Sequence, residues 1–153
     1  MEVRLATKND IEALCPVLTE FFAYNAAVQP AYCHADIETG EYPKEIIESE
    51  IADFLIAVEN NKVIGFVHIS QMKTAPYGSI VPHNYAEIIA FMVTAFCRKQ
   101  GVGEMLLEAA KNWSKARKLD YIELMSLINA DEANSFYDNK DFSTKALIRR
   151  HML

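Results

Sequence analysis

The sequence has few cysteines, and it lacks both a metal-binding cysteine pattern and a long hydrophobic run. Cys15, Cys33 and Cys97 are odd in number and widely spaced, with no Cys-x-x-Cys pair or Cys/His cluster. This pattern argues against a disulfide framework and against a zinc site. The apolar run at 88–97 is far shorter than the ~20 residues of a membrane-spanning helix, and the first residues are typical of a strand rather than a signal peptide. We therefore expect a cytoplasmic protein with no bound metal and no membrane association.

Positive charge is also scarce. The chain has 15 Lys and Arg against 21 Asp and Glu, a net charge of -6. Surfaces that bind nucleic acid are normally basic, so nucleic acid is not an expected partner, whereas a cationic small molecule is compatible with this charge. The 153 residues, 51% of them hydrophobic, are enough for one domain with a sizeable core, and we expect residues 1–153 to form it.

The spacing of hydrophobic residues predicts an alternation of strands and helices. Strands are expected at 3–5, 54–58, 63–70, 85–93, 121–125 and 144–148, and helices at 43–51, 102–118 and 131–139. Another helix, of roughly 14 residues, should begin near Asn9 or Asp10. Residues 59–62 read as a hairpin turn. This mixture predicts an α/β sandwich on a mixed sheet, an α+β arrangement.

One glycine turn is the strongest functional signal. It lies between the predicted strand 85–93 and the predicted helix 102–118, and it consists of Arg98, Lys99, Gln100, Gly101, Val102 and Gly103. Glycine allows close backbone approach, and the unpaired N–H groups and dipole of a helix N-terminus attract a phosphate. The turn matches neither a Walker A loop nor a dinucleotide fingerprint. Taken alone, it is equally compatible with close strand–helix packing.

Neighbouring motifs make the chain resemble the GNAT N-acetyltransferase superfamily, whose loop reads Arg/Gln-x-x-Gly-x-Gly/Ala. Ala86-Glu87-Ile88 precedes the turn, and Ala133-Asn134-Ser135-Phe136-Tyr137 follows it and leads to Phe142. The family usually has glycine before the closing aromatic residue, where this chain has Asp141. Asp tolerates the left-handed conformation that such a glycine adopts. The resemblance implies a GNAT-type fold.

The resemblance also implies that acetyl-CoA is the co-substrate. The backbone of residues 98–103 would hold the pyrophosphate, and Arg98 and Lys99 would add positive charge, although Lys99 also reads as an ordinary solvated residue. The pantetheine arm would lie between two splayed strands, one carrying Met92 and Val93 and the other ending near 125. Asn129 resembles the asparagine that contacts pantetheine in the family.

Two residues are candidates for the proton transfers of amine acetylation. Glu87 is predicted to share a mostly apolar strand face, where desolvation would raise its pKa toward that of a useful base. That face is expected to carry Ile89, Phe91 and Val93. Tyr137 matches the tyrosine expected to protonate the departing CoA thiolate. The alternatives are an ion-paired or solvated Glu87 and a Tyr137 that only packs in the core. His68 and His83 are expected to be structural.

The acceptor is expected to bind near residues 24–50 and 75–84. The first region is acidic and would attract a cationic amine, although such a charge run is usually a solvated helix face. Its acidic residues are Asp36, Glu38, Glu41, Glu45, Glu48 and Glu50. The expected function is therefore acetyl-CoA-dependent N-acetylation of a primary amine on a small molecule or peptide. The alternatives are a non-catalytic acyl-CoA-binding module and a structural domain without CoA. Dimers are common in the family, so a homodimer is compatible with the sequence, although no exposed stripe demands one.

Overall fold

The computed structural model describes residues 1–36 and 40–153, and its centre is one five-stranded sheet. The strands lie in the order β1 to β5 and span Glu2–Leu5, Ala52–Glu59, Lys62–Lys73, Asn84–Val93 and Ile122–Leu124. The first four pair antiparallel, whereas β4 and β5 are parallel. The sheet is therefore mixed, as the sequence predicted.

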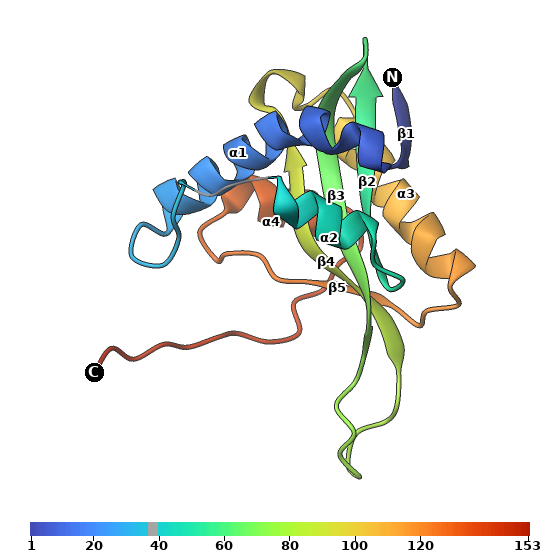
Figure 1. The fold of residues 1–153 in the computed structure, drawn as a ribbon. Coiled ribbons are helices and arrows are strands. Elements are labelled where there is room, and N and C mark those ends of the chain that lie inside the picture. Colours follow the sequence, from blue (N-terminus) through green and yellow to red (C-terminus); the bar gives the residue numbers. More distant parts are fainter. Residues whose placement is uncertain (37–39) are drawn as a thin grey trace.

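Helices cover both faces of this sheet (Figure 1). The helices α1, α2, α3 and α4 span Ile11–Val28, Glu41–Ile47, Val102–Ala116 and Asp131–Asp138. One buried cluster joins α3 to its side of the sheet through Leu106, Ala110 and Trp113. A second cluster joins α1 to the other side through Leu14, Val17 and Leu18. The sheet is the shared wall of both clusters, so its strands position whatever site the protein has.

The hairpin between β2 and β3 matches its sequence signal. Asn60 and Asn61 form the turn with φ values of 49° and 61°. A two-residue turn of this hand requires positive φ at both positions, which Asn tolerates better than most residues.

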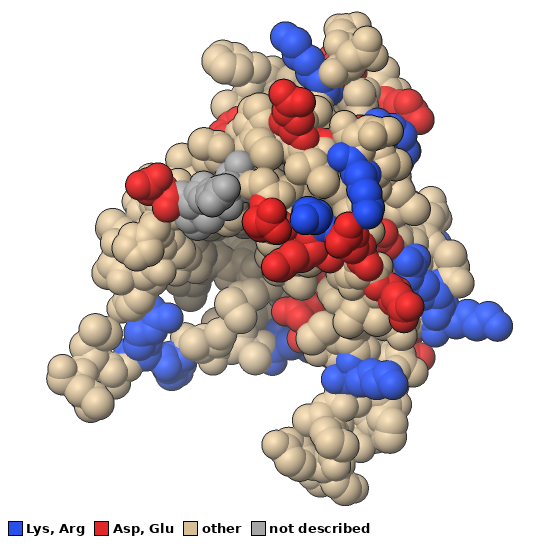
Figure 2. Space-filling view, viewed as in Figure 1, with Lys and Arg blue, Asp and Glu red and all other residues tan. Residues whose placement is uncertain are grey.

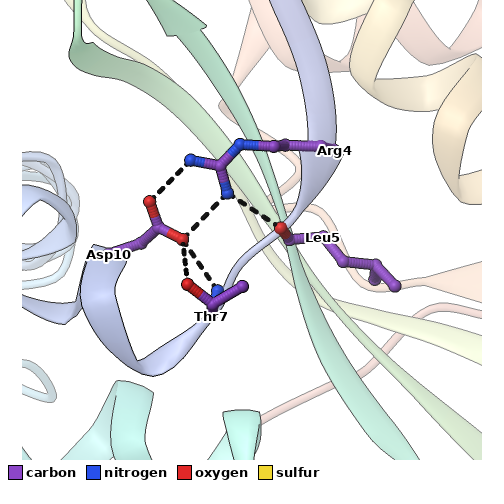
Figure 3. Close-up of polar contacts among 4 residues, drawn as sticks. All are labelled: Arg4, Leu5, Thr7 and Asp10. Atoms are coloured by element: carbon purple, nitrogen blue, oxygen red, sulfur yellow. Dashed lines mark hydrogen bonds and ion pairs between the residues drawn. The ribbon is translucent and has the colours of Figure 1, made fainter.

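A charged cluster fixes the start of α1 to β1 (Figure 3). The carboxylate of Asp10 accepts hydrogen bonds from the Arg4 guanidinium at 2.7 and 2.8 Å, and from the N–H and hydroxyl of Thr7 at 2.8 Å. The Arg4 guanidinium, above all, holds the pKa of Asp10 well below its usual range. The charge is therefore kept at neutral pH, and Thr7 and Asp10 form a capping box on the short 3-10 turn Lys8–Asp10 that leads into α1.

The helix α1 has 18 residues and is longer than the helix predicted. Its second half stays helical because Phe21 packs edge-on against Phe66 of β3, with ring centroids 5.8 Å apart. Together with the preceding turn, Lys8–Val28 is long and apolar enough to cross a membrane by length and composition alone. In the fold, its residues Leu14, Val17 and Leu18 are buried against the sheet.

Two further predicted elements differ from the structure. The helix predicted at 43–51 is α2, which begins at Glu41 and ends at Ile47, so Pro43 lies in its first turn, where proline is tolerated. The strand predicted at 144–148 does not form, and residues 143–153 have no secondary structure. Alternation in sequence makes a strand only where a partner strand supplies hydrogen bonds, and none of the strands that the structure describes pairs with this segment.

Candidate active site

A bulge in β4 marks the centre of the candidate site. His68 pairs with Ala90 and Ile69 pairs with Ile88, so Ile89 is an extra residue on β4. Such a bulge bends its strand and is common next to active sites. The parallel strand β5 pairs with β4 only as far as Ile88. Beyond the bulge, β4 continues to Val93, and β5 does not pair with this part of it. The two strands therefore separate at the bulge, and the Met92 and Val93 predicted to contact pantetheine lie beyond it.

The same bulge corrects the predicted orientation of Glu87. Ile88 packs in the cluster on the α3 side, whereas Ala90 and Met92 pack in the cluster on the α1 side. The extra residue thus reverses the alternation, because side chains alternate with a period of two. The sequence predicted that Glu87 shares a face with Phe91 and Val93, and this is wrong. Glu87 faces the side covered by α1 and α2.

Glu87 has a second carboxylate beside it. The parallel register pairs Glu87 with Glu123 of β5, and neighbouring strands lie about 4.8 Å apart. Two residues before each carboxylate, the rings of Tyr85 and Tyr121 stack with centroids 5.0 Å apart. Burial, followed by the charges of Glu123 and Glu87, raises the pKa of Tyr85. Two carboxylates and two aromatic rings thus share one face of the sheet, a combination that attracts cations.

The glycine turn ends in an exposed helix N-terminus. Gly101 caps α3 with φ of 82°, a left-handed conformation that glycine adopts without steric cost. The N–H of Met105 donates to the carbonyl of Gly101 at 3.1 Å, which is the first bond of the helix. The N–H groups of the three preceding residues have no intrahelical acceptor, as at any helix start. Such N–H groups and the helix dipole attract anions in general, and here they lie beyond the end of β4.

The side chains of the glycine turn mostly stabilise its conformation through local contacts. Arg98 donates from Nε to the carbonyl of Val93 at 3.1 Å, and its Nη1 lies 3.7 Å from the Glu132 carboxylate. Gln100 donates to the carbonyl of Phe96 at 2.9 Å. Lys99 takes a φ of 58°. Arg98 therefore ties the turn to β4 and to α4, in addition to bringing positive charge to the site.

Aromatic contacts place Tyr137 beside the end of β4 and close to the glycine turn. The rings of Phe91 and Tyr137 have centroids 6.3 Å apart, and Phe91 lies edge-on to Phe136 at 5.8 Å. A Cβ on Gly103 would lie 3.6 Å from Phe136, so β4, α3 and α4 meet here. Burial raises the pKa of Tyr137 to about 12, so its phenol is protonated at neutral pH. Asp141, which follows, has φ of 64°, the left-handed conformation expected of it.

The loop after β5 contains one predicted residue and one that the sequence analysis missed. Asn129, predicted to contact pantetheine, is exposed in this loop. Asn134 of α4 donates to the carbonyls of Leu127 and Ile128 at 2.9 and 3.3 Å, and Ser126 donates to its side-chain oxygen at 2.6 Å. Asn134 therefore shapes the loop. Asn134 lies within the segment Ala133-Asn134-Ser135-Phe136-Tyr137, and the resemblance of that segment to the family was its only sequence signal.

Comparison with known proteins now assigns the family. A family model described as Acetyltransferase (GNAT) family matches residues 16–142. The chain belongs to this family. It is also 34% identical over 65 residues to YhdJ, an uncharacterized N-acetyltransferase of Bacillus subtilis (strain 168). That match covers 42% of this chain and 46% of the relative, so it spans under half of the curated protein.

Solved structures of other proteins share the fold. A mutant of the BH1408 protein of Bacillus halodurans superposes with a TM-score of 0.91 at 20% identity, covering 100% of this chain and 99% of the other. The aminoglycoside N-acetyltransferase AAC(6')-Iy, solved in complex with CoA, gives 0.80 at 13% identity over 99% and 93% of the two chains. At these identities the likeness establishes the fold alone.

Two histidines near the candidate site are fixed by contacts with neighbouring side chains. His68 is buried, and its Nδ1 lies 2.5 Å from the hydroxyl of Tyr42 in α2. His83 lies 3.0 Å from the Asp120 carboxylate and edge-on to Tyr121. Both placements agree with the structural roles expected from the sequence.

The first predicted acceptor region, residues 24–50, lies on the α1 and α2 side as far as it is described. Figure 2 shows acidic side chains gathered in the middle of this face, next to a hollow in the surface. The predicted acidic residues on or beside α2 are Glu41, Glu45, Glu48 and Glu50, while Glu38 lies outside the described residues. A hollow at the end of α1 is lined by Phe21, Phe22, Asn25, Tyr32, Cys33, His34 and Asp36. The loop 74–83 instead projects away from the body as the tip of the β3–β4 hairpin (Figure 1).

Proposed function

We propose that this protein is an acetyl-CoA-dependent N-acetyltransferase that acts on a cationic primary amine. The observation that carries the proposal is the separation of β4 from β5 at the Ile89 bulge, with the N-terminus of α3 at the end of the freed strand. A free strand edge offers N–H and C=O groups to the amides of an extended ligand. A helix N-terminus beyond it offers a phosphate site.

Acetyl-CoA supplies an activated thioester, and the residues of this gap fit its two polar parts. The N–H groups after Gly101 would hold the pyrophosphate, with Arg98 and Lys99 as nearby cations. The backbone of β4 around Met92 and Val93 would pair with the pantetheine amides, and Asn129 would approach them from the far side. We expect these contacts to place the thioester beside the bulge.

The acceptor amine would bind on the face that carries Glu87 and Glu123. A primary amine with a pKa near ~10 arrives as an ammonium ion and must lose a proton before it attacks. We assign Glu87 as the base, directly or through a water molecule, because it precedes the bulge by two residues. Glu123 would hold the cation beside it. The amine then attacks the thioester directly, in a ternary complex.

Tyr137 would complete the reaction from the other side of β4. Its phenol is protonated at neutral pH because burial raises its pKa to about 12, and it lies against Phe91 beyond the bulge. A neutral phenol can donate its proton to the departing CoA thiolate.

Cys15, Cys33 and Cys97 are all free thiols, which fits the reducing cytoplasm that we propose as the location of the protein.

A thiol-release assay with acetyl-CoA and a panel of polyamines, aminoglycosides, amino acids and lysine peptides tests the proposal. Glu87→Gln should lose activity mainly at low pH and recover partly as pH approaches the amine pKa. Its matched control, Glu123→Gln, should raise KM for the amine and leave the pH profile of kcat unchanged. Tyr137→Phe should lower kcat roughly 10²-fold or more, as removal of a general acid does, with acetyl-CoA affinity unchanged.

The panel also separates the alternatives. A protein that binds acetyl-CoA but releases no thiol with any amine would be a non-catalytic acyl-CoA-binding module. Full activity of Glu87→Gln across the whole pH range would remove Glu87 from the mechanism.

A further inference from the structure

Two carboxylates lie side by side on the sheet with no cation to balance them. Glu87 of β4 pairs with Glu123 of β5, so about 4.8 Å separates their backbones. Among the residues that the structure describes, neither carboxylate forms an ion pair with a Lys, Arg or His side chain. Like charges on neighbouring strands destabilise a sheet. A bound ligand with two positive charges would offset this repulsion.

A buried hydroxyl next to the pair also lacks a partner. Ser70 of β3 lies directly opposite Glu87, so the row Ser70, Glu87 and Glu123 crosses three strands on one face of the sheet. Ser70 is 6% exposed, and its hydroxyl has no hydrogen-bond partner within residues 1–36 and 40–153. Buried hydroxyl groups are normally hydrogen-bonded. This hydroxyl oxygen can therefore accept an N–H from an ammonium group that reaches Glu87.

The surroundings of the two carboxylates suit an organic cation rather than a metal ion. The described part of the chain contains no group of three or more His, Cys, Asp or Glu side chains that could hold a metal ion. The stacked rings of Tyr85 and Tyr121 lie next to the carboxylates on the same face, and Met72 of β3 is opposite Tyr85. Aromatic rings attract ammonium groups, and a flexible methionine packs well against methylene groups.

We propose that the acceptor is a linear aliphatic polyamine, in which Glu123 binds one ammonium group while Glu87 and Ser70 bind the neighbouring amine that reacts. This inference rests on the proposed N-acetyltransferase function and assigns its substrate class. Three methylene groups place two nitrogens about 5 Å apart in an extended chain. That span matches the distance between the two strands, and the tyrosine rings and Met72 would contact the rest of the chain.

The charge of the product limits how far the reaction goes. Glu87 takes a proton from the nearer ammonium, the freed amine attacks the thioester carbon, and the C–S bond breaks as Tyr137 protonates the leaving thiolate. The products are CoA, an N-acetyl polyamine with one ammonium group fewer, and one proton released to solvent. An acetylated diamine no longer balances both carboxylates, so it should dissociate rather than react again.

Thiol release at saturating acetyl-CoA tests the substrate class with diamines from 1,3-diaminopropane to 1,6-diaminohexane, each against the monoamine of the same chain length. For 1,3-diaminopropane, kcat/KM should exceed that of 1-aminopropane at least about tenfold, and mass spectrometry should show one acetyl group in its product. Glu123→Gln should abolish this preference. The matched control Glu59→Gln removes an exposed carboxylate at the end of β2 and should keep it. Ser70→Ala should raise KM for diamine and monoamine alike.

Isothermal titration of 1,3-diaminopropane without acetyl-CoA separates this inference from the function on which it rests. Glu123→Gln should weaken the binding at least about tenfold. Equal turnover of diamines and monoamines, or a preference for aminoglycosides, would overturn the substrate class and leave the acetyltransferase function standing. Diamine binding that depends on Glu123, without thiol release from any amine, would support the diamine site and overturn the enzymatic function. A diamine preference that survives in Glu123→Gln would overturn the site.

Discussion

His68 shows how a single buried side chain makes stability depend on pH. It is 3% exposed, packs tilted against Phe54 with ring centroids 5.2 Å apart, and bonds through Nδ1 to Tyr42. Burial lowers the pKa of His68 to about 4, and it raises the pKa of Tyr42. Both groups are therefore neutral at pH 7. Their hydrogen bond ties α2, which borders the predicted acceptor face, to β3.

Acid should weaken the fold through His68. Its pKa in the folded protein lies below the unfolded value of about 6.5, so the unfolded chain binds more protons between pH 6.5 and 4. Its contribution to stability is complete above pH 6.5 and is lost as pH falls toward 4, by up to about 3 kcal/mol. Urea unfolding of wild type and His68→Gln at pH 7.0, 5.5 and 4.5 measures this. Wild type should lose more stability than the variant, whereas His34→Gln, at an exposed site, should match wild type.

At the scale of the element, the turn between β4 and α3 depends on the conformation of one glycine. Gly101 has φ of 82°, and a Cβ there would meet no atom within 4 Å. The cost of Gly101→Ala is therefore backbone strain of about 1–2 kcal/mol rather than a clash. We expect this variant to weaken acetyl-CoA binding by about tenfold, because relief of the strain moves the N–H groups of the phosphate site.

Isothermal titration of acetyl-CoA into the Gly101→Ala protein measures this effect. Gly78→Ala is the matched control, since a Cβ at Gly78 also meets nothing within 4 Å and its φ is not positive. The control should bind like wild type. Equal affinity in both variants would mean that the backbone of the turn does not hold the ligand.

Local patterns predicted most elements, and contacts distant in sequence explain the failures. Asn60 and Asn61 encode their hairpin locally, and Gly101 encodes the turn before α3. The Ile89 bulge has no such signal, because it exists only in the pairing of β4 with β3. Without it, alternation assigned Glu87 to the wrong face. The neighbour Glu123 was missed for the same reason, since only the register of β4 and β5 brings the two carboxylates together.

At the scale of the whole molecule, the sheet separates the proposed donor and acceptor sites. The edge of β4 beyond the bulge, the start of α3 and Tyr137 form the donor side, and Phe91 packs with the cluster on the α3 side of the sheet. Glu87 faces α1 and α2 instead. The bulge is the point where the two sides meet, so both substrates would reach it from opposite directions.

Acetyl-CoA should therefore stabilise the whole fold, since its proposed site joins β4, α3 and α4. At a concentration 100-fold above Kd, a ligand that binds only the folded state adds about 2.7 kcal/mol. For a chain of this size that corresponds to a rise in Tm of roughly 5–10 °C.

Two comparisons test which part of the ligand and of the protein matters. The nucleotide half of the ligand, 3′-phosphoadenosine 5′-diphosphate, lacks the pantetheine that would pair with β4, so at the same concentration it should raise Tm by less. Glu87→Gln should keep the full shift with acetyl-CoA, because Glu87 lies on the acceptor side. Scanning calorimetry measures all three. No shift with acetyl-CoA in the wild-type protein would mean that the gap beside β4 is not a donor site.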